Sequence, residues 1–72
     1  MLKNEVVITG MPLEPLRRGY PAMIREAEGD RHTTPVLWVD QLSPTEVTFE
    51  TQSTIYRLRV VAVLKGEEVR RA

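Results

Sequence analysis

The sequence contains no cysteine, and among the potential metal ligands it has only one histidine, His32. The absence of cysteine excludes disulfide bonds, thiolate zinc sites and cysteine nucleophiles. A single histidine cannot build a histidine metal cluster, and the acidic residues show no calcium-loop spacing. We therefore expect this protein to bind no metal and no other cofactor.

An excess of charge of one sign is also missing, because ten Lys and Arg residues balance ten Asp and Glu residues. Proteins that bind nucleic acid or anionic lipid mainly through charge carry a basic excess. No apolar run approaches the ~18 residues of a membrane-spanning helix. The first five residues lack the apolar core of a signal peptide. We therefore expect a cytoplasmic protein that does not contact membranes.

The chain has 72 residues, of which 42% are hydrophobic and 28% are charged. This composition is typical of one small globular domain with a thin core. We assign residues 1–64 to a single domain. Residues 65–72 form a charged tail, since Gly66 ends the last apolar run.

Residues 33–64 are rich in β-branched and aromatic side chains, which favour strands. We predict a mostly-β fold with about five short strands, arranged as a small bent antiparallel sheet or an open SH3-like barrel. The first strand covers residues 5–9 and ends at Gly10. Residues 11–19 are irregular because Pro12 and Pro15 interrupt them.

Residues 21–28 fit two structures. A strand closing through a Gly29-Asp30 loop places Glu28 opposite Arg31 and Met23 opposite Val36. A two-turn helix that begins at Pro21 and stops at Gly29 gives an α+β alternative. We favour the strand, because so short a helix is marginal in water.

The last hairpin is defined by alternation of polar and apolar residues in 46–50 and 55–59. A loop at 51–54 pairs Glu50 with Ile55, Phe49 with Tyr56 and Glu46 with Arg59. One face then collects the apolar side chains, and the other collects charged and polar ones.

Residues 33–41 are predicted to form a further strand, followed by a turn at 42–45. A four-residue turn pairs Trp38 with Phe49 and points the indole inward. A turn of three or five residues points Leu37 and Val39 inward instead.

Three segments are apolar on both strand faces, namely 6–8, 36–39 and 60–64. A strand with one solvated face should alternate, so these segments need a second cover. Either the N-terminal loop, a short helix or a bent barrel supplies it, or a partner does.

We expect no enzymatic activity, because the serines, His32 and the carboxylates match no catalytic motif. We predict a protein-interaction or assembly module that forms a homodimer or joins a larger complex. Its expected binding residues are Trp38 as anchor, Val61 and Val63 beside it, and Arg57 and Arg59 as a polar rim. The alternative is a small barrel that binds single-stranded nucleic acid through Arg57, Arg59 and Trp38.

Two stretches, 32–36 and 49–58, resemble a pattern found in small bacterial and phage proteins with SH3-like or related barrels. The resemblance covers about half of the chain and consists mostly of strand residues. It implies a small β-barrel, and it implies neither an activity nor a functional residue.

Overall fold

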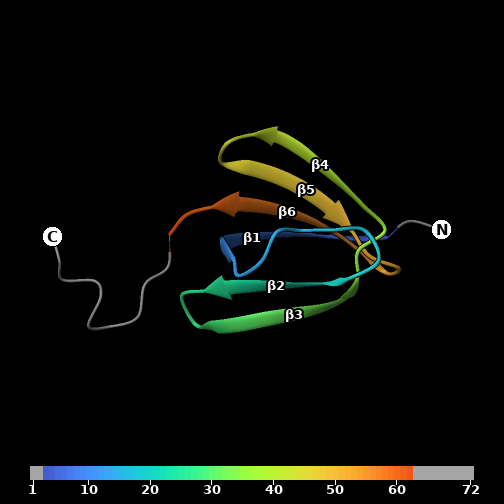
Figure 1. The fold of residues 1–72 in the computed structure, drawn as a ribbon, viewed down its shortest axis with the longest axis horizontal. Coiled ribbons are helices and arrows are strands. Elements are labelled where there is room, and N and C mark those ends of the chain that lie inside the picture. Colours follow the sequence, from blue (N-terminus) through green and yellow to red (C-terminus); the bar gives the residue numbers. More distant parts are fainter. Residues whose placement is uncertain (1–2, 63–72) are drawn as a thin grey trace, which may run out of the picture.

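The computed structural model describes residues 3–62 and places most of them in six strands and none in a helix (Figure 1). The strands form one open sheet in the order β3-β2-β1-β6-β5-β4. The predicted mostly-β fold, a small bent sheet or open barrel, is confirmed. The strand bounds are β1 (Asn4–Pro12), β2 (Pro21–Glu26), β3 (Gly29–Pro35), β4 (Trp38–Ser43), β5 (Glu46–Glu50) and β6 (Thr54–Val60).

Strand β1 joins the two halves of the sheet. Residues 4–10 pair in parallel with β6, whereas Met11 and Pro12 pair antiparallel with β2. The other neighbouring strands are antiparallel, so the prediction of an antiparallel sheet fails only at the β1–β6 pair. Strands β2–β5 lie between β1 and β6 in the chain. They provide the long connection that two parallel neighbouring strands require.

Gly10 does not end the first strand, as the sequence had suggested; it allows the strand to pass from one half to the other. A Cβ atom at Gly10 would overlap the carbonyl oxygen of Arg25 and would lie 3.1 Å from Cγ2 of Ile24. Glycine is therefore needed at this position for close approach of the β2 backbone.

Residues 21–26 form a strand, which excludes the helical alternative. The turn lies at 27–28, however, and Gly29 begins the next strand opposite Glu26. Met23 therefore faces His32 rather than Val36. The predicted loop is wrong because the positive φ, 140° at Gly29, falls directly after the turn instead of inside it.

Residues 33–41 are divided between β3 and β4, which lie at opposite edges of the sheet (Figure 1). The break lies at Val36, whose N–H donates to the carbonyl of Tyr20 at 2.9 Å and whose own carbonyl accepts from Gly19 N–H at 2.8 Å. At this break the chain passes from one half of the sheet to the other. The expected single strand is therefore divided in two, and the sheet has six strands rather than about five.

The last hairpin has the predicted register throughout, from Glu50 opposite Ile55 to Glu46 opposite Arg59. The aromatic rings of Phe49 and Tyr56 stack with centroids 4.9 Å apart. The core lies between this hairpin and the other half of the sheet, and its buried side chains are Ile8, Ala22, Ile24, Val36, Val47, Phe49 and Leu58. None of the described residues belongs to a helix long and apolar enough to cross a membrane.

Candidate interaction surface

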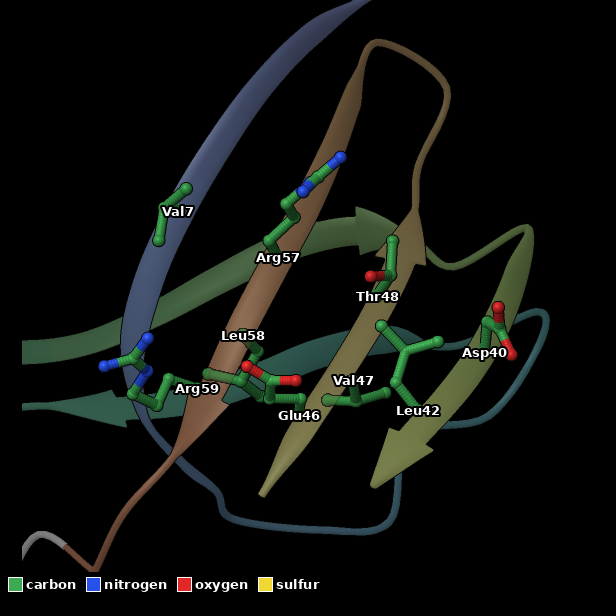
Figure 2. A pocket seen from close by; sticks show the side chains of 9 residues that line it. All are labelled: Val7, Asp40, Leu42, Glu46, Val47, Thr48, Arg57, Leu58 and Arg59. Carbon is green, nitrogen blue, oxygen red and sulfur yellow. The ribbon is translucent and has the colours of Figure 1, made fainter. Parts of the chain in front are cut away.

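The sheet face that points away from the core is hollowed over β1, β6, β5 and β4 (Figure 2). Alternation along paired strands brings one row of side chains from Val7 through Arg57 and Thr48 to Asp40. A second row holds Arg59 and Glu46, followed by Leu42 (Figure 2). The hollow measures about 420 Å³ and is lined by Val7, Asp40, Leu42, Glu46, Val47, Thr48, Arg57, Leu58 and Arg59.

Charges of both signs share this hollow. Arg57 Nη2 lies 3.6 Å from Glu5 Oε2, and both side chains are more than half exposed. Arg59 lies opposite Glu46 in register, but no ion pair joins them among the described contacts. Exposed pairs of this kind stabilise little, and nearby carboxylates reduce the attraction of the arginines for a phosphate. Within residues 3–62, no cluster of acidic or histidine side chains could hold a metal ion.

The neighbouring edge strand β4 is the most apolar part of the exposed surface. Its outer edge has no strand beside it, because β4 ends the strand order. Of seven large apolar side chains that are exposed in the described part of the chain, four lie within 37–42. Their exposed fractions are 47% for Leu37, 39% for Trp38, 36% for Val39 and 60% for Leu42. An unpaired edge with apolar side chains is a template for an added strand.

The opposite edge, β3, has a different character. It consists of Gly29–Pro35 and none of its residues is a large exposed apolar side chain. Asp30 lies near the Arg25 guanidinium, and Arg31 is held by Glu26. Charges and a terminal proline discourage pairing with another chain. The two edges are therefore not equivalent: β4 carries exposed apolar side chains, whereas β3 carries charged and polar ones.

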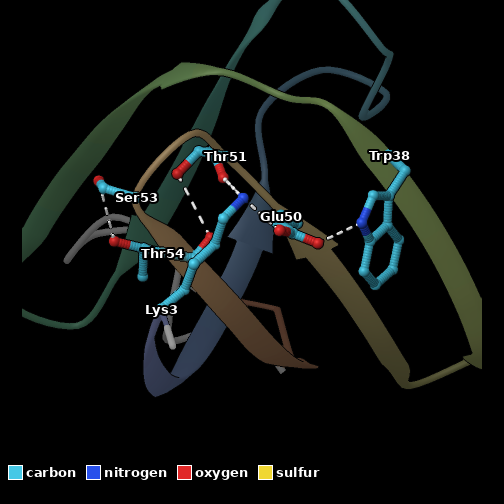
Figure 3. A network of polar contacts seen from close by, with 6 residues as sticks. All are labelled: Lys3, Trp38, Glu50, Thr51, Ser53 and Thr54. Carbon is cyan, nitrogen blue, oxygen red and sulfur yellow. Dashed lines mark hydrogen bonds and ion pairs between the residues drawn. The ribbon is translucent and has the colours of Figure 1, made fainter. Parts of the chain in front are cut away.

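The single tryptophan is oriented by a polar network (Figure 3). Trp38 Nε1–H donates to Glu50 Oε1, and the other oxygen of Glu50 pairs with Lys3 Nζ. Lys3 Nζ also donates to the carbonyl of Thr51 at 2.9 Å. The hydrogen bond from Lys3, and secondly the one from Trp38, holds the pKa of Glu50 below its usual value. The indole is thus fixed while more than a third of its surface is exposed.

The structure places three of the five predicted binding residues on one face. Trp38 is opposite Glu50, while Arg57 and Arg59 line the hollow beside it. Val61 is 38% exposed and donates its N–H to the carbonyl of Gly10, beyond the far end of β6. Five strand residues, or ~17 Å, separate that end from the row of Trp38. Val61 therefore does not border Trp38, and Val63 lies outside the described residues.

The register of β4 decides which alternative for Trp38 holds. Val39, not Trp38, is opposite Phe49, because β4 continues to Ser43 and has a bulge between Gln41 and Ser43. The four-residue turn is therefore wrong. Val39 lies on the core side of the sheet, as expected for a turn of three or five residues. Its side chain is nevertheless exposed, because β4 is an edge strand.

Sequence reasoning missed Leu42 as a surface residue and Glu50 as the partner of Trp38. The sequence places Leu42 in a turn, and residues 38–42 show no polar–apolar alternation that would indicate a continuing strand. Nothing local in the sequence indicates the contact between Glu50 and Lys3, since they are far apart in the chain. Comparisons with protein-family models, with curated proteins and with solved structures found no match to this chain. The functional argument therefore rests on the geometry.

Proposed function

We propose that this protein is a non-enzymatic interaction module that self-associates through the free edge of β4. The observation that supports this most strongly is the concentration of exposed apolar side chains at 37–42 on an edge strand. Strand addition satisfies the free backbone groups of such an edge, and apolar side chains along it add affinity. The zero formal charge means that two copies do not repel each other strongly.

Trp38 supports this proposal as the anchor of the surface. Tryptophan is enriched among the residues that contribute most to interface energy. Its contact with Glu50 fixes the indole before a partner arrives. A side chain that is already ordered loses less conformational entropy on binding.

Sedimentation equilibrium at micromolar concentration tests the proposal. We expect the wild-type protein to be in equilibrium between monomer and dimer, and Val39→Lys to shift it to monomer, because a charged edge opposes strand pairing. Thr34→Lys is the matched control, since it adds the same charge to an exposed position on the opposite edge. A wild type that is strictly monomeric, or two variants with equal effect, would refute self-association through β4.

The second candidate is binding of single-stranded nucleic acid by Arg57, Arg59 and Trp38, which do share one face. Asp40, Glu46 and Glu5 weaken it. Titration of a labelled oligonucleotide at two salt concentrations tests this candidate, which requires binding that falls steeply as salt rises. Arg57→Glu should abolish such binding and leave sedimentation of the protein nearly unchanged.

A further inference from the structure

We propose that the partner of β4 is β4 of a second copy, paired antiparallel about a two-fold axis at Val39. This inference rests on the proposed function and specifies its geometry. Residue 39 then lies opposite residue 39 of the other copy, Trp38 lies opposite Asp40, and Leu37 lies opposite Gln41. The two open sheets become one continuous sheet across the dimer.

The charge on Asp40 excludes the neighbouring arrangement. A two-fold axis perpendicular to the sheet places side chains of one sheet face opposite side chains of the same face. Side chains alternate between the two faces, so this is possible only if the axis passes through a residue rather than between two residues. An axis at Asp40 would place two carboxylates directly opposite each other, which is destabilising. Moving the axis to Val39 replaces this repulsion by a contact of each Asp40 with an indole.

The two ends of β4 exclude axes farther along the strand. The register with β5 is regular over residues 38–41 and is interrupted by the bulge before Ser43. An axis at Gln41 would extend pairing through that bulge to Pro44, which has no N–H to donate. On the other side, Val36 already uses its N–H and its carbonyl in bonds to Tyr20 and Gly19. The N–H of Leu37 is likewise bonded, to the carbonyl of Glu50 at 2.7 Å. The free segment is therefore 38–41, and with the axes at Asp40 and Gln41 excluded, Val39 is the position that remains for the axis.

The difference between the edges explains why the partner is β4 itself. If β4 paired with β3 of another copy, each molecule would keep one open edge and the assembly would grow without closing. The charged side chains of β3 and Pro35 oppose that contact. Pairing of β4 with β4 buries both apolar edges in a closed dimer.

Single-cysteine variants test the register sharply, because the wild-type chain has no cysteine and each disulfide must join two copies. Directly opposed residues have Cβ atoms ~5 Å apart, which approaches disulfide geometry. We expect Val39→Cys to form a disulfide dimer in a mild glutathione buffer. The matched variants Gln41→Cys and Leu42→Cys, also at exposed positions of β4, keep the Asp40 carboxylate and should remain unlinked. In the proposed register, the two residues 41 are offset by four positions, or ~13 Å along the strands.

The outcomes separate this inference from the proposed function. Efficient linkage at position 39 alone supports the axis at Val39. If the wild type is dimeric by sedimentation, but the variants link at position 41 or 42 or at none of the three positions, the axis is overturned and self-association is left intact. A monomeric wild type without linkage overturns both.

Discussion

Trp38 and Glu50 show how a few side chains prepare an edge strand for binding. Glu50 accepts the indole N–H and is itself held by Lys3, so three elements meet at one carboxylate: the start of the described chain, β4 and the end of β5. The contact joins register partners on adjacent strands. The orientation of the anchor residue therefore depends on the charge of one partly buried carboxylate.

This dependence predicts an effect of acid. The pKa of Glu50 in the folded protein is lowered from 4.5 by hydrogen bonds from Lys3 and Trp38. The stabilisation from these contacts is therefore complete above about pH 4.5 and is lost as pH falls through the lowered folded-state value. We expect the emission of Trp38 to change in this acidic range, with no such step in Glu50→Gln. An identical titration of both proteins would contradict the contact.

Gly10 is a second residue with a specific structural role, because the β2 backbone approaches it too closely for a side chain. A methyl group there would press on the carbonyl oxygen of Arg25, which is backbone and cannot rotate away. We expect Gly10→Ala to lower the free energy of unfolding by about 1–3 kcal/mol. Thr9→Ala, at an exposed neighbouring position, should change it by less than about 0.5 kcal/mol. Urea denaturation measures both, and equal midpoints would contradict the proposed close contact.

Among the elements, the β5–β6 hairpin is the part that local sequence determines most completely. Its alternation allows only one register that separates apolar from polar side chains, and the structure has that register. The inward residues Val47, Phe49 and Leu58 are buried, and they contribute three of the seven core side chains. The hairpin is therefore the centre of the packed half of the molecule.

Removal of the Phe49 ring tests this role. Phe49 is fully buried and stacks on Tyr56. Phe49→Ala should cost about 3–5 kcal/mol, which is comparable to the total stability of a domain this small. We expect its β-sheet circular dichroism signal to be largely lost at room temperature. Thr48→Ala, one residue away on the outer face, should remain folded, and equal stability of the two variants would contradict the assignment of the core.

The elements that the sequence did not determine are those set by distant contacts. The break at Val36 depends on hydrogen bonds to Gly19 and Tyr20, which no local pattern shows. The parallel pairing of β1 with β6 joins the two ends of the described fold. The placement of Arg57 and Arg59 on one face followed from strand alternation. The face that Trp38 occupies and its separation from Val61 required the register of β4 and the full strand order.

At the scale of the whole molecule, the apolar segments are only partly covered within the described residues. The inward residues Val6, Ile8 and Val36 contribute to the core, but Val7 is 73% exposed and residues 37–39 line an open edge. The sheet is open and ends in two unlike edges, one charged and one apolar. This asymmetry favours a closed pair of molecules over a growing chain.

Hydrogen–deuterium exchange as a function of protein concentration tests this account most directly, since it reports on the backbone of each edge separately. The account predicts that amides within Trp38–Ser43 become more protected as concentration rises through the association range, while those of Gly29–Pro35 stay unchanged. Equal exchange of β4 at all concentrations, or concentration-dependent protection of β3 instead, would contradict it.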